Sequence, residues 1–143
     1  MDQTLASQLE ETCRDFGIIG LWVFGSRANE ITASVRALPA VHGPADADLD
    51  IGVLFPRKLR PDARTRVRIA AQLEDLLRVP RVDLVILGEA SAFLALDIIR
   101  GEQLVDLDPR AAAEFELYVL RRAGDLQPFR REKITAVLSE GAR

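Results

Sequence analysis

The sequence predicts a single α+β domain in which three or four short strands are backed by helices and the C-terminal part is helical. Its 143 residues are enough for one domain with a buried core. Short runs rich in β-branched and aromatic residues are bounded by glycine or proline, and longer stretches carry apolar residues at helical spacing. These two patterns predict the class. Residues 1–143 are therefore expected to form one domain, with a helical segment at about 108–143.

The first half of the chain predicts one helix, two strands and a long connection. Apolar residues at helical spacing predict a helix over residues 3–16, which a glycine follows. The apolar run 18–24 is typical of a buried strand. Residues 30–47 show no sustained period and contain prolines and a glycine, so we expect mostly loop. Acidic and apolar residues alternate at the start of 48–55, which predicts the second strand.

The second half continues with alternating helices and strands. A helix is expected over residues 61–79, a strand over 81–87, a helix over 91–100 and a short strand over 103–105. The helix over 61–79 is predicted to bury six residues: Val67, Ala70, Ala71, Leu73, Leu76 and Leu77.

The C-terminal part predicts two helices. Asp108 and Pro109 form an N-cap and first-turn pair for one helix, and a final helix is expected from about Pro128 to Ser139. Four apolar residues fit either a core against the sheet or a surface for a partner or a second copy: Leu117, Leu120, Leu126 and Phe129. Both interpretations, and with them a homo-oligomer, stay open.

Composition and charge exclude several classes of function. The net charge of −3 and the isoelectric point near 5.2 disfavour nucleic acid as a partner. No apolar run is long enough to cross a membrane and the first residues are polar, so neither a span nor a signal peptide is expected. Cys13 is the only cysteine, which excludes an internal disulfide and fits a reducing, cytoplasmic location. With His42 as the only histidine, a Cys/His zinc site is excluded too, which leaves carboxylates, hydroxyls and a hard metal ion.

Three aspartates in the predicted strands are the candidate metal ligands. Asp48 and Asp50 stand one pleat apart, so their side chains project from the same face of a strand. Such a pair repels, and Mg²⁺, which prefers carboxylate oxygens, supplies the missing counter-charge. Asp83 is the only acidic residue of the next strand and joins them if the two strands pair. Each also has a structural alternative. Asp48 and Asp50 fit the solvated edge of a turn, or Asp46 and Asp48 form the local motif instead. Asp83 fits an ion pair with Arg81 or a cap of a neighbouring segment.

The segment Phe24-Gly25-Ser26-Arg27 after the first strand is the candidate phosphate site. Gly25 permits close approach of the backbone, and a short helix after it would direct free N–H groups at a phosphate. The Ser26 hydroxyl and the Arg27 guanidinium add hydrogen-bond donors. Taken alone, the segment also fits an ordinary glycine–serine turn.

In this order, the segments resemble the polymerase-β-like nucleotidyltransferase superfamily, whose motif is Gly-Ser followed at a distance by Asp-x-Asp. The similarity is closest to the minimal nucleotidyltransferases (MNT) that act as antitoxins of HEPN-domain toxins. It rests on residues 23–28, 47–53 and 82–87, and it continues from 99–102 to 125–129. The resemblance implies a polymerase-β-like fold with a small mixed sheet backed by helices.

The resemblance also implies ATP as the nucleotide donor and two Mg²⁺ ions as cofactors. Asp48 and Asp50 would hold both ions, and Asp83 would hold the one near the attacking hydroxyl and help to remove its proton. Gly25 and Ser26 would bind the β- and γ-phosphates. In the MNT antitoxins the acceptor is a tyrosine of the HEPN toxin, so this chain is expected to inactivate such a partner by adenylylation.

The chain departs from the family at two places. The usual Ala-Arg-Gly reads Ala28-Asn29-Glu30, and the segment that leads to the Asp-x-Asp pair is longer. Arg27 is expected to compensate for the lost arginine. These departures favour a second interpretation, a degenerate antitoxin that neutralises its partner by contact alone, whereas the three carboxylates favour the enzyme. A third interpretation, a small-molecule nucleotidyltransferase, is disfavoured by the short C-terminal part.

Overall fold

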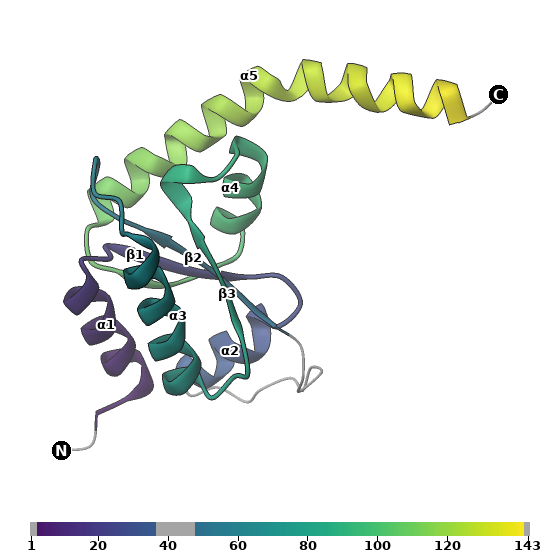
Figure 1. Cartoon of the computed structure of the whole chain (residues 1–143). Coiled ribbons are helices and arrows are strands. Elements are labelled where there is room, and N and C mark those ends of the chain that lie inside the picture. The colour runs from purple at the N-terminus through teal and green to yellow at the C-terminus, as the bar shows by residue number, and fades with distance from the viewer. Residues whose placement is uncertain (1–2, 37–47, 142–143) are drawn as a thin grey trace.

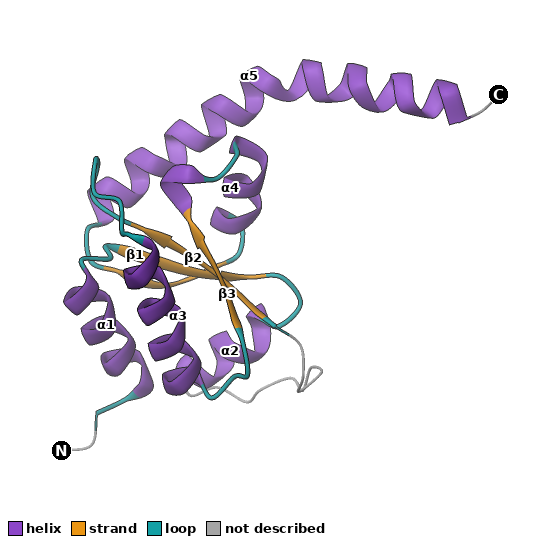
Figure 2. Cartoon of the chain, viewed as in Figure 1, coloured by secondary structure: helices purple, strands orange, loops and turns teal. Residues whose placement is uncertain are grey.

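A four-stranded mixed sheet with helices on both faces forms the body of the protein (Figure 1, Figure 2). The computed structural model describes residues 3–36 and 48–141, with side chains up to residue 126. In chain order the elements are α1 Leu5–Phe16, β1 Gly20–Phe24, α2 Ala28–Val35, β2 Leu49–Leu54, α3 Ala63–Leu77, β3 Val82–Ile86, the 3-10 turn η1 Leu87–Glu89, α4 Ala92–Ile99, β4 Glu102–Asp106 and α5 Pro109–Gly141. The predicted α+β class with a mixed sheet is confirmed.

The strand order β3-β2-β1-β4 decides which segments meet. β1 is antiparallel to both of its neighbours, whereas β2 and β3 are parallel. The amino-terminal ends of β2 and β3 therefore lie at the same end of the sheet, together with the carboxyl end of β1. The residues that follow β1 thus lie beside those that begin β2 and β3.

Two hydrophobic cores lie on opposite faces of the sheet. The first packs α1, α2 and α3 against one face and includes Ile31 and Leu73. The second packs α4 and α5 against the other face and includes Trp22, which is 1% exposed, and Ile98. Because neighbouring residues of a strand point to opposite faces, β1, β2 and β3 each contribute to both cores.

β2 shows how this alternation places its acidic residue. Three of its residues are fully buried in the first core: Leu49, Ile51 and Val53. Asp50 and Gly52 point to the other face, where Ile98 of α4 packs on Gly52 while Asp50 is only half-buried. On this face, β2 is thus closely covered at its middle and open at its amino-terminal end.

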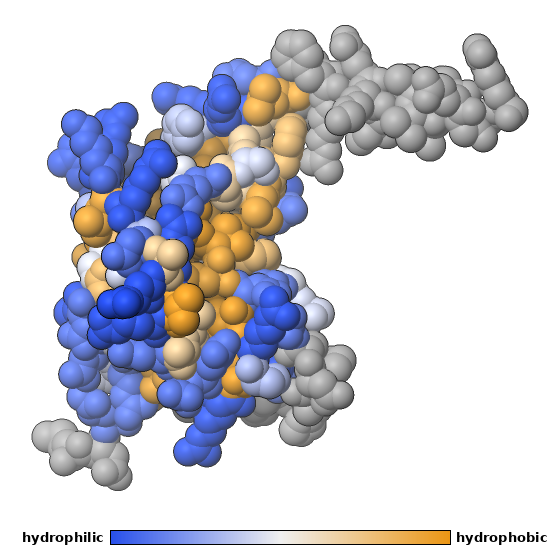
Figure 3. Space-filling view, in the orientation of Figure 1, coloured by the Kyte–Doolittle hydropathy of each residue, from blue (hydrophilic) through white to orange (hydrophobic). Residues whose placement is uncertain are grey.

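β3 is an edge strand, and its Leu84 and Val85 are half-buried. Figure 3 shows apolar side chains gathered in the middle of this side of the molecule, around β3, with hydrophilic side chains at both ends. An apolar surface therefore separates the two ends of the parallel pair.

The prediction of loop from residue 30 onwards is wrong for residues 30–35, which belong to α2. Ile31 and Val35 lie one helical turn apart and are buried in the first core, so tertiary burial stabilises a helix too short to show a clear period. Residues 37–47, which include His42 and Asp46, lie outside the described residues.

The prediction of two C-terminal helices is also wrong, because α5 continues through Gly124 and Pro128 to Gly141. Its predicted start is confirmed, since the Asp108 carboxylate accepts a hydrogen bond from the Ala111 N–H at 3.1 Å. Within the described residues, no helix is long and apolar enough to cross a membrane.

The exposure of Leu117 and Leu120 on α5 shows whether they are core residues or surface residues. Leu117 and Leu120 are 54% and 50% exposed, so they are not core residues of this chain. The helix instead buries Ala112, Val119 and Ala123. The side chain of Phe129 lies outside the described residues.

Candidate active site

Asp48, Asp50 and Asp83 all lie at the end of the sheet where β2 and β3 begin. Asp50 and Asp83 are direct partners in the parallel register, so both point to the α4–α5 face. Asp48 precedes β2, and the Leu49 N–H donates to the Arg81 carbonyl at 3.0 Å, which fixes this entry beside the start of β3. The pairing on which the predicted convergence depends is therefore present.

The pKa of Asp50 reflects the negative charges of the other two aspartates. The pKa of Asp50 is raised above its ordinary value, first by partial burial and then by the negative charges of Asp83 and Asp48. A cation beside Asp50 would lower this pKa and stabilise the ionised carboxylate.

Gly25 follows β1 at the same end of the sheet and contacts Asp50. Its φ of +82° lies in the left-handed region that favours glycine, and a Cβ at this position would collide with Oδ2 of Asp50. Ser26 is exposed next to it, and the Ala28 N–H closes the turn by donating to the Gly25 carbonyl at 3.3 Å. The turn thus favours glycine, and a larger residue here would displace the Asp50 carboxylate.

Arg27 connects this turn to α2 and points into the protein, with only 6% of the residue exposed. Its Nε and Nη2 donate to Oε2 and Oε1 of Glu30, both at 3.2 Å. Such a two-pronged pair is a strong, geometrically defined interaction. This pair was not predicted from the sequence, although the i, i+3 spacing of opposite charges could have indicated it.

The three aspartates suit a hard divalent cation in chemistry, but their side chains are parted. They supply the oxygen ligands that Mg²⁺ prefers, and their mutual repulsion calls for a counter-charge. Asp50 packs on Gly25. Asp48 and Asp83 instead face Arg81, whose Nε lies 3.9 Å and 3.4 Å from them, so the ion pair considered as a structural alternative is present too. Within the described residues, no three acidic, histidine or cysteine side chains are close enough to hold one metal ion, so joint binding requires these side chains to rotate.

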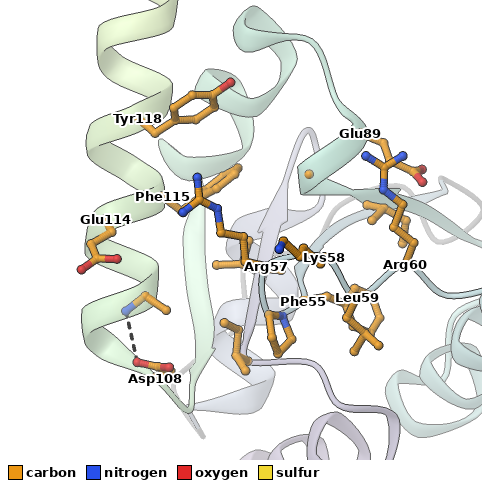
Figure 4. Close-up of a pocket in the computed structure, with 16 residues that line it drawn as sticks. Phe55, Arg57, Lys58, Leu59, Arg60, Glu89, Asp108, Glu114, Phe115 and Tyr118 are labelled. Carbon is orange, nitrogen blue, oxygen red and sulfur yellow. Dashed lines mark hydrogen bonds between the residues drawn. The ribbon is translucent and has the colours of Figure 1, made fainter.

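A cavity of about 720 Å³ lies at the other end of β2, between the β2–α3 connection and α5 (Figure 4). Its lining includes Phe55, Arg57, Lys58, Phe115 and Tyr118. Figure 4 shows Arg57 extending towards Phe115 on α5. None of the predicted site residues lines this cavity, so its size does not mark the place of the predicted chemistry.

The family of the chain follows from its match to a known sequence profile. The profile described as "Polymerase beta, Nucleotidyltransferase" matches residues 7–110, a stretch that contains all the predicted site residues. The chain belongs to the polymerase beta nucleotidyltransferase family. A comparison with curated proteins finds no significant match.

Solved structures share the fold of this nucleotidyltransferase. One is the toxin–antitoxin complex MntA–HepT with two aspartates, two positions apart, replaced by glutamate; it has a TM-score of 0.71 and 24% identity, covering 93% of this chain and 98% of that one. A second is a tri-AMPylated HEPN toxin of Shewanella oneidensis in complex with an MNT antitoxin, with a TM-score of 0.67, 24% identity and coverage of 96% and 99%. A third is a toxin–antitoxin with AMP-PNP, with a TM-score of 0.70, 24% identity and coverage of 93% and 98%. The predicted polymerase-β-like fold is thereby confirmed.

Proposed function

We propose that this nucleotidyltransferase is Mg²⁺-dependent and transfers AMP from ATP to a tyrosine hydroxyl of a HEPN toxin, and so acts as an antitoxin. One observation carries the proposal. Asp50 and Asp83 are register partners on one open face of the sheet, with Asp48 next to them and the Gly25-Ser26 turn in contact with Asp50. Acidic oxygens for a metal ion and a turn suited to phosphate thus lie side by side.

Three related structures support the proposed protein acceptor, the proposed ATP donor and the proposed metal ligands. The toxin bound to the Shewanella oneidensis MNT antitoxin carries AMP groups, which supports a protein acceptor. The structure with AMP-PNP, an analogue of ATP, supports the donor. The two aspartates replaced in MntA–HepT have the spacing of Asp48 and Asp50, which supports these residues as the working pair.

Different residues of the chain would bind the metal ions and the phosphates. Asp48, Asp50 and Asp83 would hold two Mg²⁺ ions, which when bound supply positive charge at the entering and leaving oxygens. The backbone and hydroxyl of Ser26 would bind the β- and γ-phosphates together with Gly25, while Arg27, held by Glu30, supports their turn.

Asp83 lies at the edge strand and would accept the proton of the acceptor hydroxyl. The acceptor oxygen forms a bond to the α-phosphorus of ATP as the bond from this phosphorus to the bridging oxygen breaks. AMP remains on the acceptor and pyrophosphate leaves.

Mass spectrometry of a toxin partner tests the proposal. The purified chain is incubated with ATP, Mg²⁺ and the HEPN protein encoded beside it, and the HEPN protein is expected to gain the mass of AMP on a tyrosine. The double variant Asp48→Ala/Asp50→Ala should abolish the gain. A matched variant of two exposed aspartates, Asp75→Ala/Asp97→Ala, should retain it. A partner whose mass never changes with the wild-type chain contradicts the proposal.

A second candidate function is neutralisation by contact alone. It is favoured by the Asn29-Glu30 departure, because Glu30 engages the nearby arginine that was expected to bind the nucleotide. Toxin rescue in cells separates the two candidates. If Asp48→Ala/Asp50→Ala still protects cells from the toxin as well as the wild type does, contact is sufficient.

A further inference from the structure

Arg81 lies among the candidate metal ligands although the reaction assigns it no part. It is the last residue before β3, and its carbonyl is fixed by the hydrogen bond from the Leu49 N–H. Its side chain is 68% exposed, and Nε lies 3.4 Å from Oδ1 of Asp83 and 3.9 Å from Oδ2 of Asp48. The backbone is thus anchored between the two strands while the guanidinium is only loosely held.

The position of this guanidinium explains why the carboxylates are parted. Asp48 and Asp83 turn towards Arg81, whereas Asp50 packs on Gly25. A guanidinium between two carboxylates supplies the counter-charge that a divalent ion would supply, and it faces one oxygen of each, Oδ2 of Asp48 and Oδ1 of Asp83. The two cations therefore compete for Asp48 and Asp83.

We propose that Arg81 is a built-in counter-cation, which pairs with Asp48 and Asp83 until a divalent metal ion displaces it. This inference rests on the proposed function, since it takes the three aspartates as metal ligands. The exposure of Arg81 makes displacement easy, because an exposed ion pair is weak and its guanidinium can return to water. Arg81 therefore sets the metal affinity of the site without being a ligand.

Titration of the full chain with Mn²⁺ alone tests this role, with free Mn²⁺ measured by electron paramagnetic resonance. Replacing Arg81 by glutamine removes the competitor, and we expect the dissociation constant for Mn²⁺ to fall roughly three- to tenfold, as the loss of two weak, exposed ion pairs implies. Arg81→Lys keeps a positive charge and should stay within about twofold of the wild type.

The control must separate local competition from the overall change in charge. Arg64 lies in the first turn of α3, at the far end of the molecule from the aspartates, is exposed, and forms no ion pair within the described residues. Arg64→Gln removes the same charge and should leave Mn²⁺ binding unchanged. Thermal unfolding in the presence of a chelator confirms that each variant is folded.

Each outcome decides between the possibilities. Tighter binding in Arg81→Gln but not in Arg64→Gln supports the counter-cation. Equal affinities in the wild type and Arg81→Gln, or weaker binding in Arg81→Gln, overturn it while the proposed metal site stands. If no variant, the wild type included, binds Mn²⁺ at millimolar concentration, the metal-dependent function is overturned together with this inference.

Discussion

The two ends of β2 differ in almost every property that a binding site can have. At its amino-terminal end, Asp50 lies with Asp48 and Asp83 on an open, acidic surface beside a glycine turn. At its carboxyl end lies a cavity of about 720 Å³, whose lining includes the aromatic Phe55 and the basic Arg57. Gly52, covered by Ile98, lies between them.

The difference shows that the volume of a cavity does not indicate where the candidate reactive side chains lie. The acidic end has converging charge and a raised pKa, but no three side chains of the described residues yet close around one ion. The cavity end has volume but none of the predicted site residues. The aspartate end of β2, where like charges lie close together despite their repulsion, is therefore the better candidate for the reaction.

The largest expected effect is the loss of AMP transfer on replacing Asp50 by asparagine. An active-site metal ion stabilises the transition state by several kcal/mol, so losing a ligand should lower the rate on the order of 1000-fold. The initial rate of AMP incorporation into the partner measures it. Asp97→Asn, an exposed position on α4, serves as the control. A rate for Asp50→Asn within tenfold of the wild type would remove the acidic end from the reaction.

The next largest effect is expected on stability, from a substitution at Gly52 in the middle of β2. A Cβ at Gly52 would lie 2.5 Å from Cγ2 of Ile98, so Gly52→Ala overpacks the second core and should lower the free energy of unfolding by about 1–3 kcal/mol. Urea unfolding measures the change. Gly88→Ala is the matched control, because nothing lies within 4 Å of a Cβ there, and its stability should stay near that of the wild type.

Gly25→Ala tests whether the turn after β1 and the Asp50 carboxylate depend on each other for stability. The left-handed φ of +82° should cost alanine about 1–2 kcal/mol, and the new Cβ should also push the Asp50 carboxylate away. In an Asp50→Ala background the collision is absent, so Gly25→Ala should be less destabilising there. Equal losses of stability in both backgrounds would show that Gly25 and Asp50 are not coupled.

Asp50→Asn should also make the protein more stable at neutral pH. The folded-state pKa is raised above the ordinary 3.8, so the ionised carboxylate favours unfolding, and the wild type loses stability as the pH rises from 3.8 through the raised pKa. Relieving like charges across two strands is worth about 0.2–1 kcal/mol. Melting curves between pH 3 and pH 8 should show the two proteins diverging as the pH rises; parallel curves would contradict the assignment.

The smallest effect is expected at the cavity end. Tyr118 is 60% exposed, so Tyr118→Ala should change the free energy of unfolding by no more than about 0.5 kcal/mol. The affinity of this variant for Mn²⁺ should equal that of the wild type, since Tyr118 lines the cavity at the end of β2 remote from the aspartates. A clear change in metal affinity would mean that the two ends are coupled after all.

The elements that carry the aspartates could be predicted because their signals are local. A two-residue period put Asp48 and Asp50 on one face, and the β-branched run around Asp83 marked a strand. The strand register, with Asp50 opposite Asp83, agrees with the expectation that these strands pair. Period and composition were sufficient to predict the strands, whereas the role of the aspartates stays a prediction.

The remaining features depend on contacts that local patterns do not contain. The buried stripe of α3 is Ile69, Leu73 and Leu77, which pack in the first core. Val67, which was predicted to be buried, is 69% exposed, because it lies on the face of α3 that points away from this core. The Arg27–Glu30 pair depends on α2, which itself depends on burial in the first core. Tertiary packing decided each of these outcomes.

The position of Trp22 has a practical consequence for every variant. It is the only tryptophan of the chain and lies in the second core alone. Its intrinsic fluorescence therefore reports the environment under α4 and α5, while circular dichroism follows the helices on both sides of the sheet. A substitution that loosens one layer and spares the other should separate the two signals, so an optical measurement distinguishes local disturbance from global unfolding.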